Sequence, residues 1–156
     1  MLDSGVLRNS SSSSDDRHSV PRARVRNGNN RTDNKTLTIL VVDDDEANLT
    51  LARALLEADG FAVVTAVDAM STFDVLKDVD PALILMDIQL PGMDGWELTR
   101  RLKKNIATSH IPVIAVTAYG THGDAERARD VGFVEFVAKP VSTRELPSII
   151  RKHLGL

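Results

Sequence analysis

The 156-residue sequence contains no cysteine and no long hydrophobic run. Without cysteine the chain has no disulfide framework, no thiol nucleophile and no thiolate metal site. This composition suits a reducing compartment, and we expect a cytoplasmic location. No apolar run approaches the roughly 20 residues that a transmembrane helix needs, so we also expect no membrane insertion. The length therefore fits one soluble domain with some residues to spare.

Histidine pairs with metal-binding spacing are missing as well. The four histidines are scattered, and none forms an H-x-x-x-H or H-E-x-x-H pair of the kind found in zinc sites. We therefore interpret them as solvent-facing or locally bonded residues. They are His18, His110, His122 and His153.

Residues 1–35 have almost no large apolar side chains and carry an excess of positive charge. They hold seven Lys/Arg and four Asp/Glu, whereas residues 36–156 hold twelve and eighteen. A segment rich in Ser, Arg and Asn cannot offset the entropy lost on ordering, so we predict a disordered tail here. A basic arm that touches an acidic partner is the functional alternative. Because residues 36–156 are acidic, we expect no direct binding of nucleic acid.

From Thr36 onward, apolar runs of strand length alternate with segments of helical period. This alternation predicts five βα units around a parallel sheet, in one domain over residues 36–156. Right-handed crossovers then favour a doubly wound, flavodoxin-like (βα)5 α/β fold with strand order 2-1-3-4-5. The expected strands are 37–42, 61–66, 82–86, 112–116 and 133–137, and the expected helices lie between and after them.

The start of the last helix has two alternatives. Ser142, Thr143, Arg144 and Glu145 form a capping-box pattern, which favours a start directly after Ser142. Pro147 favours a start close to itself, because proline is best tolerated in the first helical turn. Both alternatives stay open at this stage.

Polar residues stand at or just past the predicted strand ends, where an apolar core does not require them. Because parallel strands end at one edge, and ligands of such sheets bind there, these residues should share one crevice. They are Asp43, Asp44, Asp87, Thr117 and Lys139. Taken singly, each also fits a plainer interpretation as a solvated charge, a turn former or an exposed lysine. Their joint placement makes the shared crevice the stronger hypothesis.

Carboxylates that converge on one crevice repel one another and call for a cation. Hard oxygen ligands favour Mg²⁺, so we predict a magnesium site from Asp43, Asp44 and Asp87, with a backbone carbonyl after Asp87 as a further ligand. A carboxylate beside magnesium can attack phosphorus to form an acyl phosphate. The Lys139 ammonium and the Thr117 hydroxyl are suited to hold the phosphate oxygens.

Four motifs in this order resemble the response-regulator receiver family, which is CheY-like. They are ILVVDDD at 39–45, LILMDIQLPGMDG at 83–95, VTA at 116–118 and KP at 139–140. The resemblance covers about residues 36 to 155. Within the family, residues 83–91, 110–117 and 123–127 resemble the single-domain DivK type. It implies a two-component signalling protein that carries an aspartyl phosphate, and not an enzyme acting on other substrates.

The resemblance also implies a role for each matching residue. Asp87 would be the phosphoacceptor, Thr117 and Lys139 would bind the phosphoryl group, and Ala118 would leave access to Asp87. Asp44 would be a direct and Asp43 a largely water-mediated magnesium ligand, with the Gln89 backbone carbonyl as another. Thr117 and Phe136 would be the switch pair, although Phe136 lacks the hydroxyl of the tyrosine often found there. Lys139-Pro140 would be a cis peptide.

The function we predict is that of a single-domain response regulator in a phosphorelay. A histidine kinase or histidine phosphotransfer protein would charge it, and it would signal to a protein effector through the face of the fourth helix, fifth strand and fifth helix. We expect no output domain, because Leu156 comes just after the last helix. The alternative is a receiver-like binding module that works without phosphorylation. A dinucleotide-binding enzyme is disfavoured, because its first strand would lead into a Gly-rich turn.

Overall fold

The computed structural model describes residues 35–118 and 122–156. Apart from Lys35, the predicted N-terminal tail lies outside the described residues, and so do Tyr119, Gly120 and Thr121 in the expected output face. Residues 35–156 form one compact unit.

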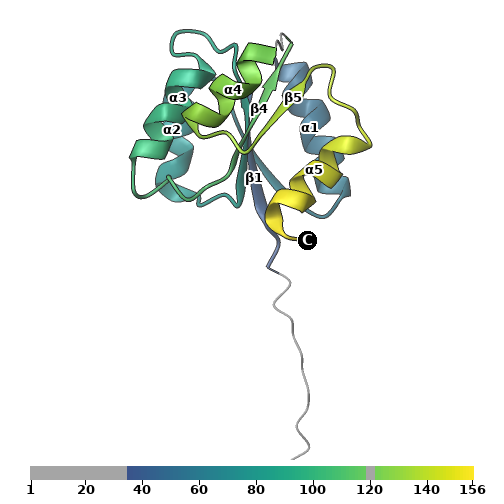
Figure 1. The fold of residues 1–156 in the computed structure, drawn as a ribbon. Coiled ribbons are helices and arrows are strands. Elements are labelled where there is room, and N and C mark those ends of the chain that lie inside the picture. Colours follow the sequence, from purple (N-terminus) through teal and green to yellow (C-terminus); the bar gives the residue numbers. More distant parts are fainter. Residues whose placement is uncertain (1–34, 119–121) are drawn as a thin grey trace, which may run out of the picture. The chain divides into compact units, whose positions relative to one another are not determined.

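A five-stranded parallel sheet runs through this unit in the order β2-β1-β3-β4-β5, as predicted (Figure 1). The strands are β1 (Thr38–Val42), β2 (Ala62–Ala66), β3 (Leu83–Asp87), β4 (Val113–Thr117) and β5 (Glu135–Ala138). Their bounds differ from the expected ones by one or two residues, because ladder hydrogen bonds and not the apolar runs set the ends of a strand.

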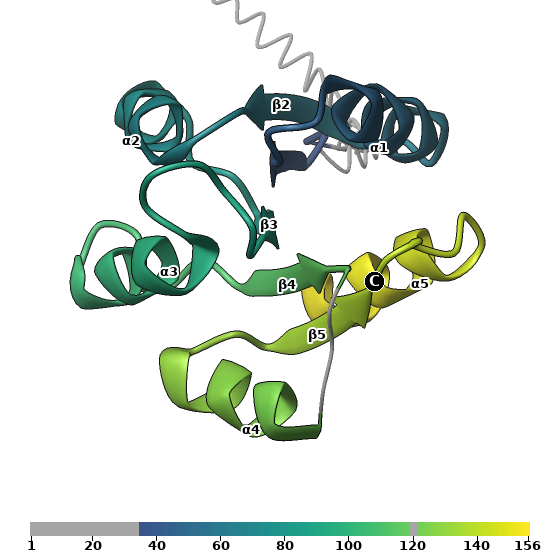
Figure 2. The same ribbon diagram turned by 90° about the horizontal axis from the view of Figure 1, so that it is seen from above.

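Helices cover both faces of the sheet, as a doubly wound fold requires. Figure 2 shows α1 and α5 over one face and α2, α3 and α4 over the other. The helices are α1 (Glu46–Ala58), α2 (Ala69–Asp78), α3 (Gly95–Lys104), α4 (His122–Val131) and α5 (Glu145–Leu154). Each connection from a strand to its helix therefore crosses the same edge of the sheet, where the strands end.

The interior strand β1 contributes to both cores, which explains its uninterrupted apolar sequence. Leu40 and Val42 pack into the core beneath α2, α3 and α4, whereas Ile39 and Val41 pack beneath α1 and α5. All four side chains are at most 5% exposed. Alternate residues of a strand point to opposite faces, so a strand covered on both sides needs apolar residues at every position.

Aspartates cap the helices that follow the sheet edge. Asp45 accepts from the Ala47 amide at 2.8 Å, and Asp94 accepts from the Glu97 amide at 2.9 Å. A capping carboxylate satisfies an amide that the first helical turn leaves without a partner. The acidic run after β1 thus has two uses, since Asp45 caps α1 while Asp43 and Asp44 stay at the strand end.

The start of α5 lies between the two sequence alternatives. The helix begins at Glu145, and the Glu145 amide donates to Ser142 Oγ at 3.3 Å, which is half of the predicted capping box. Pro147 is then the third helical residue. Its missing N–H costs little there, because amides of the first turn have no partner within the helix.

None of the helices within residues 35–118 and 122–156 combines the length and the apolar character that spanning a bilayer requires.

The two leucines on α1 with contrasting burial test this packing. Leu56 is fully buried and Leu51 is 52% exposed. We expect Leu56→Ala to lower the free energy of unfolding by about 2–5 kcal/mol, because it leaves a cavity under α1. The matched control Leu51→Ala should change it by about 0.5 kcal/mol or less. Urea denaturation measures both, and equal losses would contradict the described orientation of α1.

Candidate phosphoryl and metal site

The five polar residues predicted at the strand ends come together at one edge of the sheet. Asp43 follows β1, Asp87 ends β3, Thr117 ends β4 and Lys139 follows β5. Asp43, Asp87 and Thr117 are buried, and Asp44 beside them is exposed. The crevice therefore has a buried floor and an open side.

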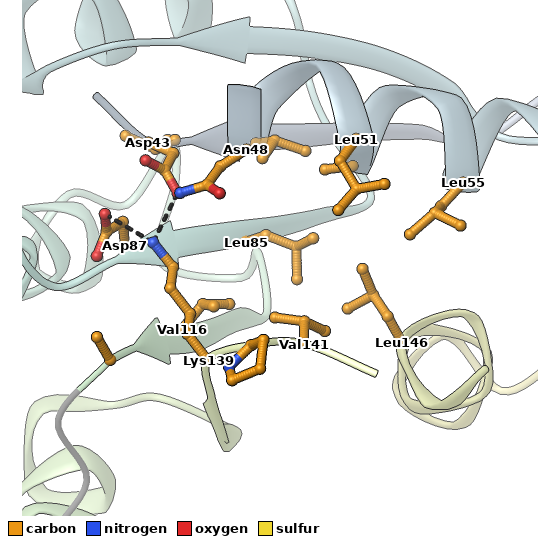
Figure 3. Close-up of a pocket in the computed structure, with 15 residues that line it drawn as sticks. Asp43, Asn48, Leu51, Leu55, Leu85, Asp87, Val116, Lys139, Val141 and Leu146 are labelled. Carbon is orange, nitrogen blue, oxygen red and sulfur yellow. Dashed lines mark hydrogen bonds and ion pairs between the residues drawn. The ribbon is translucent and has the colours of Figure 1, made fainter. Parts of the chain in front are cut away.

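Lys139 joins the two buried carboxylates (Figure 3). Its Nζ donates to Asp43 Oδ2 at 2.8 Å and to Asp87 Oδ2 at 3.1 Å, while its own side chain is 20% exposed. A second contact holds the lysine backbone, whose amide donates to the Thr117 carbonyl at 2.7 Å. The predicted cis peptide between Lys139 and Pro140 is present.

Asp43 is held by three donors. Its Oδ1 accepts from the Asp45 amide at 2.9 Å, and its Oδ2 accepts from Asn48 Nδ2 at 3.2 Å as well as from Lys139. Sequence reasoning missed Asn48. Its place in the first turn of α1, directly after the acidic run, is the signal that identifies it, since that turn faces back toward the end of β1.

Asp87 is a buried carboxylate under opposing influences. Burial raises the pKa of Asp87 above its ordinary value of 3.8, hydrogen bonds from the Gln89 amide and from Lys139 oppose this, and the Asp43 charge adds to it. The Gln89 amide donates to Asp87 Oδ1 at 3.0 Å. Ionised Asp87 therefore lowers the stability of the fold, and a further cation in the crevice would reduce this loss.

The lysine shows the complementary balance. Burial alone would lower the pKa of Lys139, but hydrogen bonds to Asp43 and Asp87 outweigh it and raise the pKa. The ammonium thus stays charged at neutral pH. One positive charge faces three carboxylates here, which leaves the crevice with an excess of negative charge.

The donor set fits a divalent metal ion. Carboxylate oxygens of Asp43, Asp44 and Asp87 lie within 4.8 Å of one another, close enough to share one ion. Carboxylates with room for water suit Mg²⁺, which keeps several waters when it binds to proteins. The predicted ligand role of the Gln89 carbonyl stays a prediction.

The residues expected to receive and sense the phosphoryl group lie on β5 or at the carboxyl end of β4. Thr117 is 2% exposed, while Ala118 is exposed and lines the crevice with Asp87. Phe136 lies on β5 opposite Ala115 and is partly buried against the core beneath α4. Their roles as phosphoryl ligand and switch remain proposals.

A groove that the sequence did not reveal leads from the site between α1 and α5. Its volume is about 390 Å³, and beyond the polar end its walls are apolar. Leu51, Leu55, Val141 and Leu146 form much of that wall (Figure 3). Because helices α1 and α5 are far apart in the sequence, only the fold brings these residues together.

A doubly wound sheet with carboxylates and a lysine at its carboxyl edge defines a class of phosphate- and metal-handling α/β proteins. Residues 39–151 match the family model of the response regulator receiver domain. The chain belongs to this family, which confirms the resemblance seen in its motifs and places it among the response regulators of two-component signalling.

Relatives and solved structures agree with this assignment. The chain is 40% identical over 120 residues to the polar-differentiation response regulator DivK of Brucella ovis, covering 77% of this chain and 98% of that protein. A CheY-like receiver domain protein from Methanospirillum hungatei JF-1 shares 31% identity at a TM-score of 0.71, over 77% of this chain and 94% of that one. A sensor histidine kinase receiver domain from Pseudomonas aeruginosa PAO1, with magnesium coordinated in its active-site cleft, shares 30% identity at a TM-score of 0.70, over 78% and 99%.

The raised pKa of Asp87 generates a stability prediction. Because the folded state holds this proton more tightly than the unfolded chain, the contribution of Asp87 to stability falls as the pH rises through the raised pKa. In buffer without divalent ions, Asp87→Asn should therefore be more stable than the wild type at pH 7, and this advantage should shrink toward pH 4. Urea unfolding at several pH values measures it.

Saturating magnesium should make the wild type more stable to unfolding than Asp87→Asn. A concentration about 100 times the Kd stabilises a folded protein by about 2.7 kcal/mol, and Asp87→Asn should gain less because it removes a ligand charge. Asp130→Asn, an exposed aspartate on α4, is the matched control and should behave like the wild type. Equal stabilisation of all three proteins by magnesium would contradict a magnesium site that includes Asp87.

Proposed function

We propose that this receiver domain accepts a phosphoryl group on Asp87 from a histidine kinase or histidine phosphotransfer protein, and that it passes the signal on by protein contacts. The observation that supports this most directly is the Lys139 ammonium, which bridges Asp43 and Asp87 within a cluster of three carboxylates. The arrangement supplies a nucleophile, a phosphate-binding cation and a metal site at one place.

Each residue has a defined part in the transfer. A carboxylate oxygen of Asp87 attacks phosphorus, the bond between phosphorus and the donor's nitrogen or oxygen breaks, and the donor leaves with that electron pair. Lys139 exchanges its hydrogen bond to Asp87 for one to a phosphoryl oxygen, and the Thr117 hydroxyl donates to another. Exposed Ala118 leaves the approach to Asp87 open.

Asp43, Asp44 and Asp87, with the Gln89 carbonyl, would hold the magnesium ion. When bound, the ion neutralises charge on the phosphoryl oxygens. The magnesium in the cleft of the P. aeruginosa receiver domain supports this assignment. Asn48, which donates to Asp43, keeps that carboxylate turned toward the cluster.

The signal would leave through the face of α4, β5 and α5. Thr117 and Phe136 lie on the neighbouring strands β4 and β5, so a shift of Thr117 toward the phosphoryl group opens space that Phe136 can fill. We further propose that the domain catalyses only its own phosphorylation and dephosphorylation, that it works in the cytoplasm, and that the receiver domain itself spans residues 36–156.

Phosphorylation with a small-molecule donor tests the acceptor. Incubation with Mg²⁺ and acetyl phosphate should add one phosphoryl group, detected by intact-protein mass spectrometry. Asp87→Asn should not be modified, because its amide is not a nucleophile. Lys139→Ala should react at least about 100-fold more slowly, and Asp130→Asn is the control for an unrelated carboxylate. Modification of Asp87→Asn to the wild-type extent would exclude Asp87 as the acceptor.

The groove between α1 and α5 offers the donor protein an apolar surface next to Asp87. We expect Leu51→Arg to slow phosphoryl transfer from a kinase or phosphotransfer protein that charges the wild type, by about 10-fold or more. Its reaction with acetyl phosphate should be unchanged, because that donor needs no docking surface. The control Leu156→Arg places the same charge at an exposed leucine outside the groove. Equal slowing with both donors would mean that Leu51 acts on the site and not on docking.

A further inference from the structure

A stack of three side chains joins α3, α4 and the segment that leads into β5. Arg127 of α4 lies with its guanidinium carbon 4.3 Å from the centroid of the Trp96 ring on α3. Phe133 meets the same ring edge-on, with centroids 5.6 Å apart and planes at 85°. Trp96 is only 7% exposed, so its position is set by these neighbours and by the core.

Trp96 is in turn tied to the backbone that follows Asp87. The preceding residue, Gly95, donates its amide to the Ile88 carbonyl at 2.8 Å. A Cβ atom at Gly95 would lie 2.4 Å from the Asp87 carbonyl oxygen, so only glycine allows this close approach. The first turn of α3 is therefore seated on the Asp87 loop, and a shift of that loop displaces Trp96 with it.

Arg127 has no competing attachment within the described part of the chain. It forms no ion pair with any residue in 35–118 or 122–156, and it is exposed apart from its contact with the indole. A cation over the face of tryptophan is held by the quadrupole of the ring. The position of this guanidinium thus depends on where the Trp96 ring lies.

We infer that Trp96 and Arg127 are positioning residues that couple α4 to the Asp87 loop. This inference rests on the proposed function, because it concerns how the proposed acceptor reaches the proposed output face. The chain already links Asp87 to α4 through β4 and Thr117. The stack is a second, independent link that runs from Asp87 through Gly95 and Trp96 to Arg127, and it bypasses the Thr117 and Phe136 pair.

Amide hydrogen exchange of α4 tests the coupling in the full chain. Two perturbations are applied: Mg²⁺ with acetyl phosphate, and the substitution Asp87→Ala, which releases the loop without any phosphorylation. In the wild-type background, both should change exchange in residues 122–131. With Arg127→Ala, the α4 change should become clearly smaller, because only the link through β4 and Thr117 remains, while the change at the start of α3 persists.

Conservative variants separate coupling from simple loosening of the helix. Arg127→Lys keeps a cation and should retain much of the α4 response, as should Trp96→Phe, which keeps a ring. Trp96→Leu should reduce the α4 response as much as Arg127→Ala does. Arg129→Ala removes an exposed arginine from the same helix and should respond like the wild type. A merely structural role would alter exchange equally in the presence and absence of each perturbation.

The outcomes distinguish this inference from the proposed function. If acetyl phosphate does not modify Asp87, but Asp87→Ala still changes α4 more strongly when Arg127 is present, the proposed function fails and the coupling stands. If α4 responds equally with and without Arg127, or responds to neither perturbation, the coupling is overturned. The extent of Asp87 modification has no bearing on that second result.

Discussion

The bridge from Lys139 to Asp43 and Asp87 is the interaction on which the site depends. Two buried carboxylates from neighbouring strands repel each other, and the desolvation that accompanies burial adds to the cost. One ammonium group, at 2.8 Å and 3.1 Å, holds both in place. Removing it would leave two buried carboxylates with hydrogen bonds but without a positive charge to balance them.

Lys139 does not neutralise all of the negative charge in the crevice, and the remaining negative charge favours the binding of a cation. Three carboxylates face one lysine, and Asp44 lies on the open side where an incoming cation meets it first. Burial is the main cause that raises the pKa of Asp87, and the negative charge of Asp43 adds to it. In the function that we propose, a metal ion relieves the repulsion, and a phosphoryl group then brings oxygens for Lys139 and the metal to hold. The excess of negative charge is thus small enough for the domain to fold and large enough to favour the binding of a cation.

Two sets of contacts connect the surroundings of Asp87 to other elements of the fold. On one side, β4 carries Thr117, whose carbonyl accepts from the Lys139 amide at 2.7 Å. On the other, Gly95 seats α3 on the Asp87 backbone and brings Trp96 against Arg127. In the proposed mechanism, both paths end at the face formed by α4 and β5. A small shift of the loop after Asp87 would then alter a surface that Asp87 does not touch.

The sequence by itself determined the parallel sheet, its strand order and the polar residues at its edge. Periodicity and strand ends are local properties of the chain, so Asp43, Asp87 and Lys139 could be assigned to one crevice without coordinates. Only the tertiary structure decided which partners each of them has, that α1 and α5 enclose an apolar groove, and that Arg127 covers Trp96. Those contacts join residues far apart in the chain, and the packing of helices against the sheet sets their distances in a way that no local pattern records.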